Sequence, residues 1–397
     1  MIRHLLKLIW NRKRSNFLIM LEIFFAFLVL FVVSTLSVFY LDNYNKPLGF
    51  SYENVWRVVI DSRQQNITPQ QRIEKTRQII MALESFDEVE SVAGMFILPF
   101  NMADYNNNYQ IKGRKVSVHI NTATDGLKDV LDLKVTRGRW FEKSDEAANT
   151  NLVVINESLG KELFGNEDPI GKPLFEVKPG EEEKRVIGVI SDFRKNGELA
   201  PLTNYFFERA SLYDTVNITL PNQLVIKLRP GTTVQFEEKL VTRLQNTVGE
   251  WSYEVEPLKE ARRSHMLFYL APLIILGIVA GFLILGVSLG LIGIIWQNVK
   301  ARANEIGLRR AAGATVTHIY TQILIELLLI ASLGMFLGVL LVMQFPLLGV
   351  IDFIGTKVYM TALAISILFI YLVALICGLY PSWLATKVQP TEALHAE

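Results

Sequence analysis

Four long apolar runs, one near the N-terminus and three near the C-terminus, constrain the fold of this chain of 397 residues more than any other feature. A helix needs about 20 predominantly apolar residues to cross a bilayer, and each run reaches that length. The sequence therefore predicts a membrane α-helical protein with spans at 17–40, 266–297, 318–343 and 358–380. Residues 41–265, which are of mixed polar sequence, predict a large domain outside the bilayer.

Basic residues near the spans predict the orientation, because cytoplasmic flanks carry an excess of Lys and Arg. The N-terminal segment 1–16 and the connection 298–317 contain nine such residues: Arg3, Lys7, Arg12, Lys13, Arg14, Lys300, Arg302, Arg309 and Arg310. The connection 344–357 holds only Lys357. We therefore expect segments 1–16, 298–317 and the tail 381–397 in the cytoplasm, and 41–265 outside it.

The N-terminal segment has a pattern of its own. Basic residues occupy much of this segment. Its apolar residues recur at the spacing of one helix face: Ile2, Leu5, Leu6, Ile9 and Trp10. This favours an amphipathic helix over residues 1–16 in the surface of the membrane. A simple basic flank is the alternative.

The second span is longer than a bilayer requires. Helical character begins near Leu258 and continues past Trp296, which amounts to roughly 45 residues or 65–70 Å. A bilayer core takes about 30 Å, so the excess predicts a stalk outside the membrane. A rigid rod of this kind could carry motion across the membrane, and a helix break near His265 is the alternative.

Pairs of glycines four residues apart occur in the second and third spans: Gly277 and Gly281, Gly286 and Gly290, Gly334 and Gly338. Small residues at this spacing let helix backbones approach closely. The pattern favours packing within a bundle or across a dimer. The alternative is that glycine is simply common in membrane helices.

Two carboxylates lie inside the predicted spans, Glu22 in the first and Glu326 in the third. An intramembrane carboxylate is a candidate functional group. Both lie near the inner ends of their spans, which favours an interfacial or structural role over proton or ion handling. The spans carry no polar stripe, and this argues against a route for a small hydrophilic solute.

The outer domain alternates between strand-like and helix-like segments, which predicts an α+β fold in two subdomains. Strands are expected at 55–60, 89–97, 109–112, 115–120, 152–155, 185–190, 224–228 and 252–255, and helices at 69–85, 157–164 and 234–247. Thr68 is the expected N-cap of the first helix, and Gly113 with Arg114 the turn of a hairpin.

No catalytic, cofactor or metal residue is assigned from the sequence. The histidines are scattered without ligand spacing, no H-E-x-x-H motif occurs, and residues 41–265 contain no G-x-S-x-G motif. Formal net charge is +1, so nothing indicates nucleic acid as a partner. A membrane-bound enzyme is therefore the least favoured class of function.

The cytoplasmic run NEIGLRRAAGAT at 304–315 resembles the signature loop of the FtsX-like or MacB-like permeases, the type VII ABC group. The tail runs GLYPSWLA (378–385) and PTEAL (390–394) and the outer runs GRWFEKSDE (138–146), VVINESLGKELFG (153–165), DPIGKPL (168–174) and GVISDFR (188–194) are similar to the same family. The resemblance implies an outer domain of the MacB periplasmic core type. It also implies docking on an ATP-binding subunit through Glu305, Ile306, Gly307, Leu308, Arg309, Arg310 and Gly313.

The resemblance implies a function with several partners. The chain has no G-x-x-x-x-G-K-[ST] motif, so ATP and Mg are expected in a separate cytoplasmic subunit. The implied role is a permease of the bacterial inner membrane that works by mechanotransmission in efflux or export. It would pair with a second copy or a homologous permease, and a periplasmic adaptor is a further candidate partner. A non-transporting signalling subunit and a lipoprotein-release permease are the alternatives.

The residues of the cytoplasmic run allow a second interpretation. A short basic and apolar helix could dock in a groove of a partner protein. It could equally contact anionic lipid as an ordinary juxtamembrane segment. The residues alone do not separate these, and the resemblance favours docking.

Overall fold

The computed structural model describes residues 13–62, 68–111, 113–148, 150–176, 182–210, 223–301, 308, 315–348 and 354–385. The chain divides into two compact units. One, the membrane unit, comprises Met1–Asp42 and Leu270–Glu397. The other, the outer unit, comprises Asn43–Tyr269. The predicted segment 1–16 lies outside the described residues up to Arg12.

Four helices of the described residues are long and apolar enough to cross a membrane. They are α2 (Lys13–Tyr44), α7 (Leu258–Ala301), α9 (Val316–Leu347) and α10 (Thr356–Ala385). Each contains one of the runs 17–40, 266–297, 318–343 and 358–380. The α7 helix is continuous through His265, so the alternative of a break at that residue is wrong.

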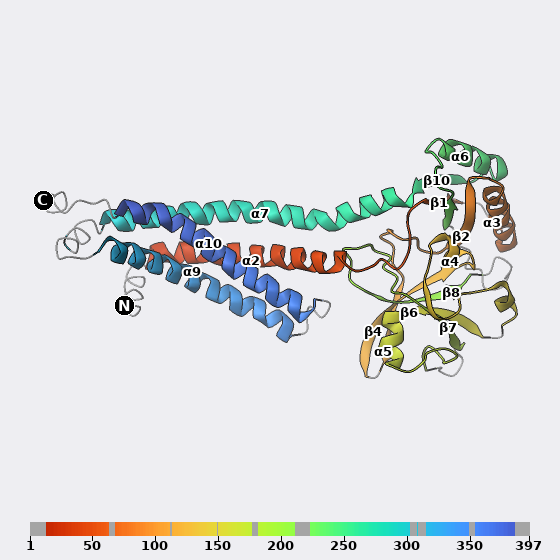
Figure 1. The fold of residues 1–397 in the computed structure, drawn as a ribbon, viewed down its shortest axis with the longest axis horizontal. Helices are drawn as coiled ribbons and strands as arrows, with labels where there is room; N and C mark the ends of the chain where they lie inside the picture. Colours follow the sequence, from red (N-terminus) through yellow and green to blue (C-terminus); the bar gives the residue numbers. More distant parts are fainter. Residues whose placement is uncertain are drawn as a thin grey trace. The chain divides into compact units, whose positions relative to one another are not determined.

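The membrane unit has an apolar interior. Figure 1 shows α9 and α10 side by side, with α2 next to them. Their buried side chains form one cluster that includes Ile23, Phe27, Ala331, Met335 and Ala362. Large apolar side chains also cover the outside of these helices, as expected of helices that face lipid.

The outer unit is built on a mixed sheet to which ten strands of the described residues belong. The strands are β1 (Val55–Asp61), β2 (Val89–Met95), β3 (Asn106–Ile111), β4 (Arg114–Ala123), β5 (Val135–Gly138), β6 (Asn151–Asn156), β7 (Lys184–Ile190), β8 (Asn204–Arg209), β9 (Gln223–Leu228) and β10 (Ser252–Pro257). Their order is β10-β1-β9-β2-β4-β8-β6-β7-β5, and β3 pairs with β4. The β4–β8 and β6–β7 pairs are parallel, and the other pairs are antiparallel.

Short helices cover parts of this sheet: α3 (Pro69–Glu84), α4 (Leu127–Val130), α5 (Glu157–Phe164), α6 (Phe236–Thr247) and the 3-10 helix η1 (Lys143–Ala147). Figure 1 shows α3 and α6 near β2 and β10. Aromatic and aliphatic side chains from these helices and strands form a buried cluster there. A second cluster lies under α5. A third, rich in aromatic rings, includes buried side chains of β2, β4, α4 and β8. The α+β prediction is confirmed.

Local sequence signals explain the helix starts. Thr68 Oγ1 accepts a hydrogen bond from the Gln71 amide, and Gln71 Oε1 accepts one from the Thr68 amide. This capping box, with Pro69 in the first turn, satisfies amide groups that a helix start leaves free. The predicted cap at Thr68 is therefore confirmed. In the β3–β4 hairpin, Gly113 has φ +79, and Arg114 already belongs to the strand.

Candidate functional site

The predicted docking run lies almost entirely outside the described residues. This applies to Glu305, Ile306, Gly307, Arg309, Arg310 and Gly313. Leu308 is described, and its side chain is 62% exposed. The run connects α7, which ends at Ala301, with α9, which begins at Val316 behind the N-cap Thr315. An exposed leucine between two basic segments is the kind of side chain that a partner groove can cover.

One glycine pair on α7 lies against the first membrane helix. A Cβ at Gly286 would lie 2.5 Å from Glu22 Oε1, and a Cβ at Gly290 would lie 3.0 Å from Glu22 Oε2. Ile19 lies against Gly290 as well. The structure therefore brings together a predicted polar residue and two predicted packing residues, with the Glu22 carboxylate in the groove that the glycines leave open.

The glycine pair on α9 faces the same helix from another side. A Cβ at Gly334 would lie 2.9 Å from the Met20 carbonyl oxygen and 3.0 Å from Ile23. A Cβ at Gly338 would lie 2.5 Å from the Phe27 ring. Both positions require a residue without a side chain, because α2 approaches closely there.

The third pair, on α7, has a different surrounding. A Cβ at Gly277 or at Gly281 would meet nothing within 4 Å among the described residues. Neighbouring apolar side chains on this helix are well exposed, among them Ile278 and Phe282. Packing among the described residues of the chain thus accounts for four of the six glycines. Glu326, the other predicted polar residue, is buried in α9.

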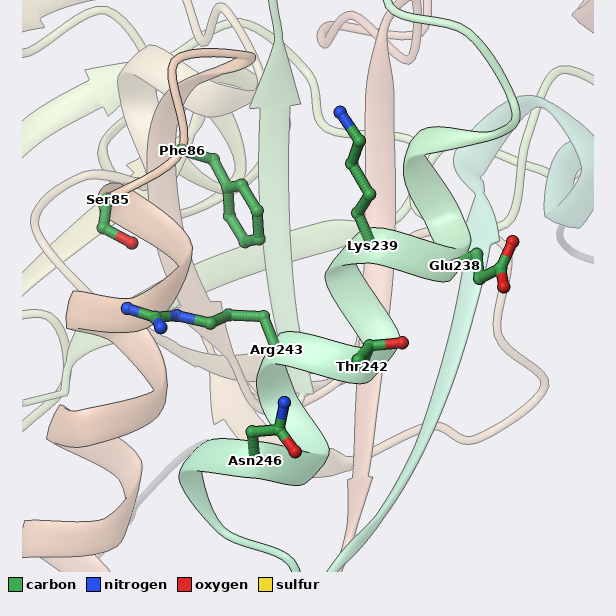
Figure 2. A pocket seen from close by; sticks show the side chains of 7 residues that line it. All are labelled: Ser85, Phe86, Glu238, Lys239, Thr242, Arg243 and Asn246. Atoms are coloured by element: carbon green, nitrogen blue, oxygen red, sulfur yellow. The ribbon is translucent and has the colours of Figure 1, made fainter.

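A pocket of the outer unit lies between the end of α3 and α6. Its lining residues are labelled in Figure 2: Ser85, Phe86, Glu238, Lys239, Thr242, Arg243 and Asn246. Arg243 extends from α6 toward the end of α3, whereas Glu238 points away from it. Ser85 Oγ donates to the Ala82 carbonyl, as expected at a helix end. The labelled side chains do not pair a nucleophile with a base, so the pocket shows no catalytic arrangement.

The described residues hold no group of three or more His, Cys, Asp or Glu side chains placed to bind a metal ion. Many charged side chains of the outer unit instead form ion pairs at its surface. The best buried of these carboxylates is Asp145, which accepts hydrogen bonds from Arg139 at 2.5 and 2.7 Å. These bonds lower the pKa of Asp145.

Residues 191–200, which follow β7, contain functional candidates that the sequence did not identify. Arg194 and Lys195 are each only 2% exposed, and burial lowers the pKa of both side chains. Their neighbour Glu198 is also buried. Only Arg194 belongs to a run noted in the sequence, at 188–194, and nothing in that run indicates that its charge is buried.

Comparisons with known proteins agree with this layout. The family profile of the MacB-like periplasmic core domain matches residues 17–243. The profile of the FtsX-like permease C-terminal region matches residues 266–390. The ABC transporter permease YknZ of Bacillus subtilis (strain 168) is 27% identical over 289 residues, which cover 70% of each protein.

Two further matches involve MacB itself. The macrolide export ATP-binding/permease protein MacB of Neisseria meningitidis serogroup A is 26% identical over 287 residues. The match covers 67% of this chain and 42% of that protein, so the chain spans less than half of that relative. The crystal structure of the periplasmic region of MacB from Actinobacillus actinomycetemcomitans is 19% identical, with a TM-score of 0.38, and covers 53% of this chain and 92% of that one.

Proposed function

The chain belongs to the family of ABC transporter permeases with a MacB-like periplasmic core domain and an FtsX-like C-terminal region, and from this we propose that it is the permease subunit of an ABC complex. It is a membrane protein with an extracytoplasmic domain. In the proposed mechanism a separate subunit hydrolyses ATP in the cytoplasm. The membrane helices then transmit the resulting movement to the outer unit.

The continuous α7 helix is the observation that carries this proposal. It has 44 residues, which at 1.5 Å per residue corresponds to about 66 Å. The hydrocarbon core of a bilayer takes about 30 Å of that length. The helix starts directly after β10, and Leu258 and Ala261 of its first turn are buried in the core of the outer unit. A helix anchored in this way moves with the outer unit.

The partner subunit would bind the run between α7 and α9. We assign the contact to Glu305, Ile306, Gly307, Leu308, Arg309, Arg310 and Gly313, with the exposed Leu308 as its apolar contact. ATP and Mg would be bound by the partner. A second copy of this chain, or a homologous permease, would supply the other half of the membrane unit, and a periplasmic adaptor is a further partner.

The interior of the membrane unit favours action on material that is already outside the membrane. Thr35 and Ser366 are buried there, and each hydroxyl donates to a carbonyl of its own helix. Such hydroxyls do not line a polar path. We therefore propose efflux or export of a periplasmic substrate. The alternatives, which would use the same mechanism, are a non-transporting signalling subunit and a lipoprotein-release permease. Both termini would lie in the cytoplasm of a bacterial cell.

Copurification of the full chain from membranes tests the proposal. Replacing residues 305–310 with a Gly-Ser linker should abolish recovery of an ATP-binding subunit and the chain-dependent stimulation of its ATPase rate. A matched control replaces residues 349–353 of the opposite connection with Gly-Ser and should keep both. Full recovery and unchanged stimulation in the first variant would contradict the docking assignment. A wall hydrolase in the purified complex would favour the signalling form.

A further inference from the structure

Residues 191–200, of sequence SDFRKNGELA, form a loop after β7 that contacts both long helices entering the outer unit. We propose that this junction loop is the joint that couples α7 to the outer unit, and that the Glu198–Arg262 ion pair is its decisive contact. The inference rests on the proposed function, since it names the residues through which helix movement would reach the outer unit.

Arg194 fastens the junction loop to the end of α2. Its Nη1 donates to the carbonyl oxygens of Asn43 at 2.8 Å and Lys46 at 3.0 Å. Asn43 lies in the last turn of α2, where helix carbonyls lack partners in the helix and carry partial negative charge. The buried guanidinium therefore acts as a C-terminal cap. Its Nη2 donates to Glu198 and Ala200, each at 2.7 Å, which ties the loop to itself.

The chain after α2 lies directly against the junction loop. The Arg194 amide donates to the Leu48 carbonyl at 2.9 Å. Next to it, Gly49 has φ +82, and a Cβ there would lie 1.9 Å from the Asp192 carbonyl oxygen. Only glycine fits both the backbone angle and this approach. Asp192 Oδ1 in turn accepts from the Ser158 amide at 2.8 Å, which holds the loop to the start of α5.

Lys195 fastens a further segment. Its Nζ donates to the carbonyl oxygens of Asn101 at 3.2 Å and Ala103 at 2.5 Å. The Lys195 carbonyl accepts from the Phe100 amide at 2.8 Å. Two adjacent buried cations, bound mainly by backbone carbonyls, thus hold the segments on either side of the loop. Removing either side chain would take a hydrogen bond from several of these carbonyls and should destabilise the outer unit.

The junction loop contacts α7 through an ion pair between two side chains. Glu198 Oε1 accepts a hydrogen bond from Arg262 Nε at 2.7 Å and forms an ion pair with Arg262 Nη2, also at 2.7 Å. Arg262 lies in the second turn of α7, and its guanidinium also lies 4.8 Å from the centre of the Tyr52 ring. This ion pair is partly exposed, at 11% for Glu198 and 21% for Arg262. Because water reaches part of both side chains, breaking this ion pair costs less than breaking a fully buried one.

One turn further along α7, His265 lies beside Phe100, with ring centres 6.4 Å apart. Phe100 is the residue whose amide binds the Lys195 carbonyl. The His265 ring also forms a hydrogen bond with the backbone of Asn196, so α7 meets the junction loop directly through both Arg262 and His265. A displacement of α7 along its axis pulls on Glu198 first, because that contact is the charged and directional one.

The experiment uses the full chain copurified with its ATP-binding subunit. Spin labels are attached at Thr242→Cys on α6 and Lys357→Cys on α10 in a Cys377→Ala background, with unlabelled chain in excess. Distances are measured without nucleotide and after trapping with MgATP and vanadate. We expect the Glu198→Gln variant to keep the ATPase rate. The fraction of complexes that show the distance seen after trapping should fall about fivefold. The double variant Glu198→Arg with Arg262→Glu should restore it.

A control variant and a hydrogen-exchange measurement test whether the effect is specific to the Glu198–Arg262 ion pair. Asp132→Asn removes another ion pair of the outer unit, with Lys227, and should leave the trapped distance unchanged. Hydrogen exchange of residues 258–266 without nucleotide should rise in Glu198→Gln and return to normal in the double variant. An unchanged trapped distance in Glu198→Gln overturns the inference. If the unsubstituted complex shows no MgATP-dependent change, the proposed function is contradicted instead, and the exchange measurement still decides whether the ion pair holds α7.

Discussion

Asp145 shows how a single carboxylate stabilises the outer unit. Its side chain is 5% exposed, receives two hydrogen bonds from Arg139 and accepts a third from the Glu142 amide at 2.9 Å. The hydrogen bonds from Arg139 are the largest cause of its lowered pKa. A carboxylate whose pKa is lower in the folded state adds stability above its unfolded value of about 3.9. That stability is lost as the pH falls through the folded pKa.

We therefore expect Asp145→Asn to lower the free energy of unfolding at pH 7 by about 1 kcal/mol, since Arg139 is partly exposed and its charge is screened. The difference from the unsubstituted chain should narrow as the pH falls below about 4. This stability difference is measured by thermal unfolding of the full chain in detergent, with tryptophan fluorescence as the signal. The exposed Asp87→Asn is the control. A difference that stays constant with pH would contradict this explanation.

At the same scale, Arg194 shows why the junction loop could not be predicted from the sequence. The run 188–194 is recognisable, but its arginine resembles any surface cation. Two of its four acceptors are the carbonyls of Asn43 and Lys46, which are 151 and 148 residues away in the chain. Backbone acceptors carry no residue signal, so neither spacing nor residue type indicates the contact.

Among the elements, the α3 helix could be predicted from a local signal, whereas β5 and β8 were not predicted. The cap and first turn of α3 are determined by adjacent residues, Thr68 to Gln71. The β8 strand was missed, although Phe206 and Phe207 are fully buried. It is held by a parallel pairing with β4 and an antiparallel one with β6, both far away in the chain. A strand buried on both faces lacks the alternation that reveals a half-exposed strand.

The membrane helices lead to a prediction about packing. Gly334→Leu in α9 would drive a side chain into the Met20 carbonyl and Ile23, whereas at Gly277 in α7 a Cβ would meet nothing within 4 Å among the described residues. Overpacking of this kind costs about 1–3 kcal/mol. We expect Gly334→Leu to lower the melting temperature and the monodisperse fraction of the chain in detergent.

Gly277→Leu is the matched control for that measurement, because it adds the same side chain to a membrane helix. It should leave the melting temperature of the chain unchanged. Equal losses in the two variants would show that the contacts of α2 with α9 do not decide the stability of the membrane unit.

For the molecule as a whole, the sequence predicts the order of the spans and their direction but not how the units work together. Length and hydropathy suffice for the spans because a bilayer imposes one thickness on every helix. The stalk was predicted from helical character alone, and α7 extends over 258–301 as one helix. The anchoring of its first turns in the outer unit depends on β10 and the junction loop, which are folded contacts rather than sequence patterns.

Direction across the membrane gives the last prediction. In a Cys377→Ala background, Lys161→Cys lies on the exposed surface of α5 and Leu308→Cys in the connection between α7 and α9. The basic residues around Leu308 predict that it lies in the cytoplasm. A membrane-impermeant maleimide should therefore label Lys161→Cys in spheroplasts and label Leu308→Cys only after lysis. Reversed labelling would contradict the orientation, and with it the docking of a cytoplasmic ATPase on this run.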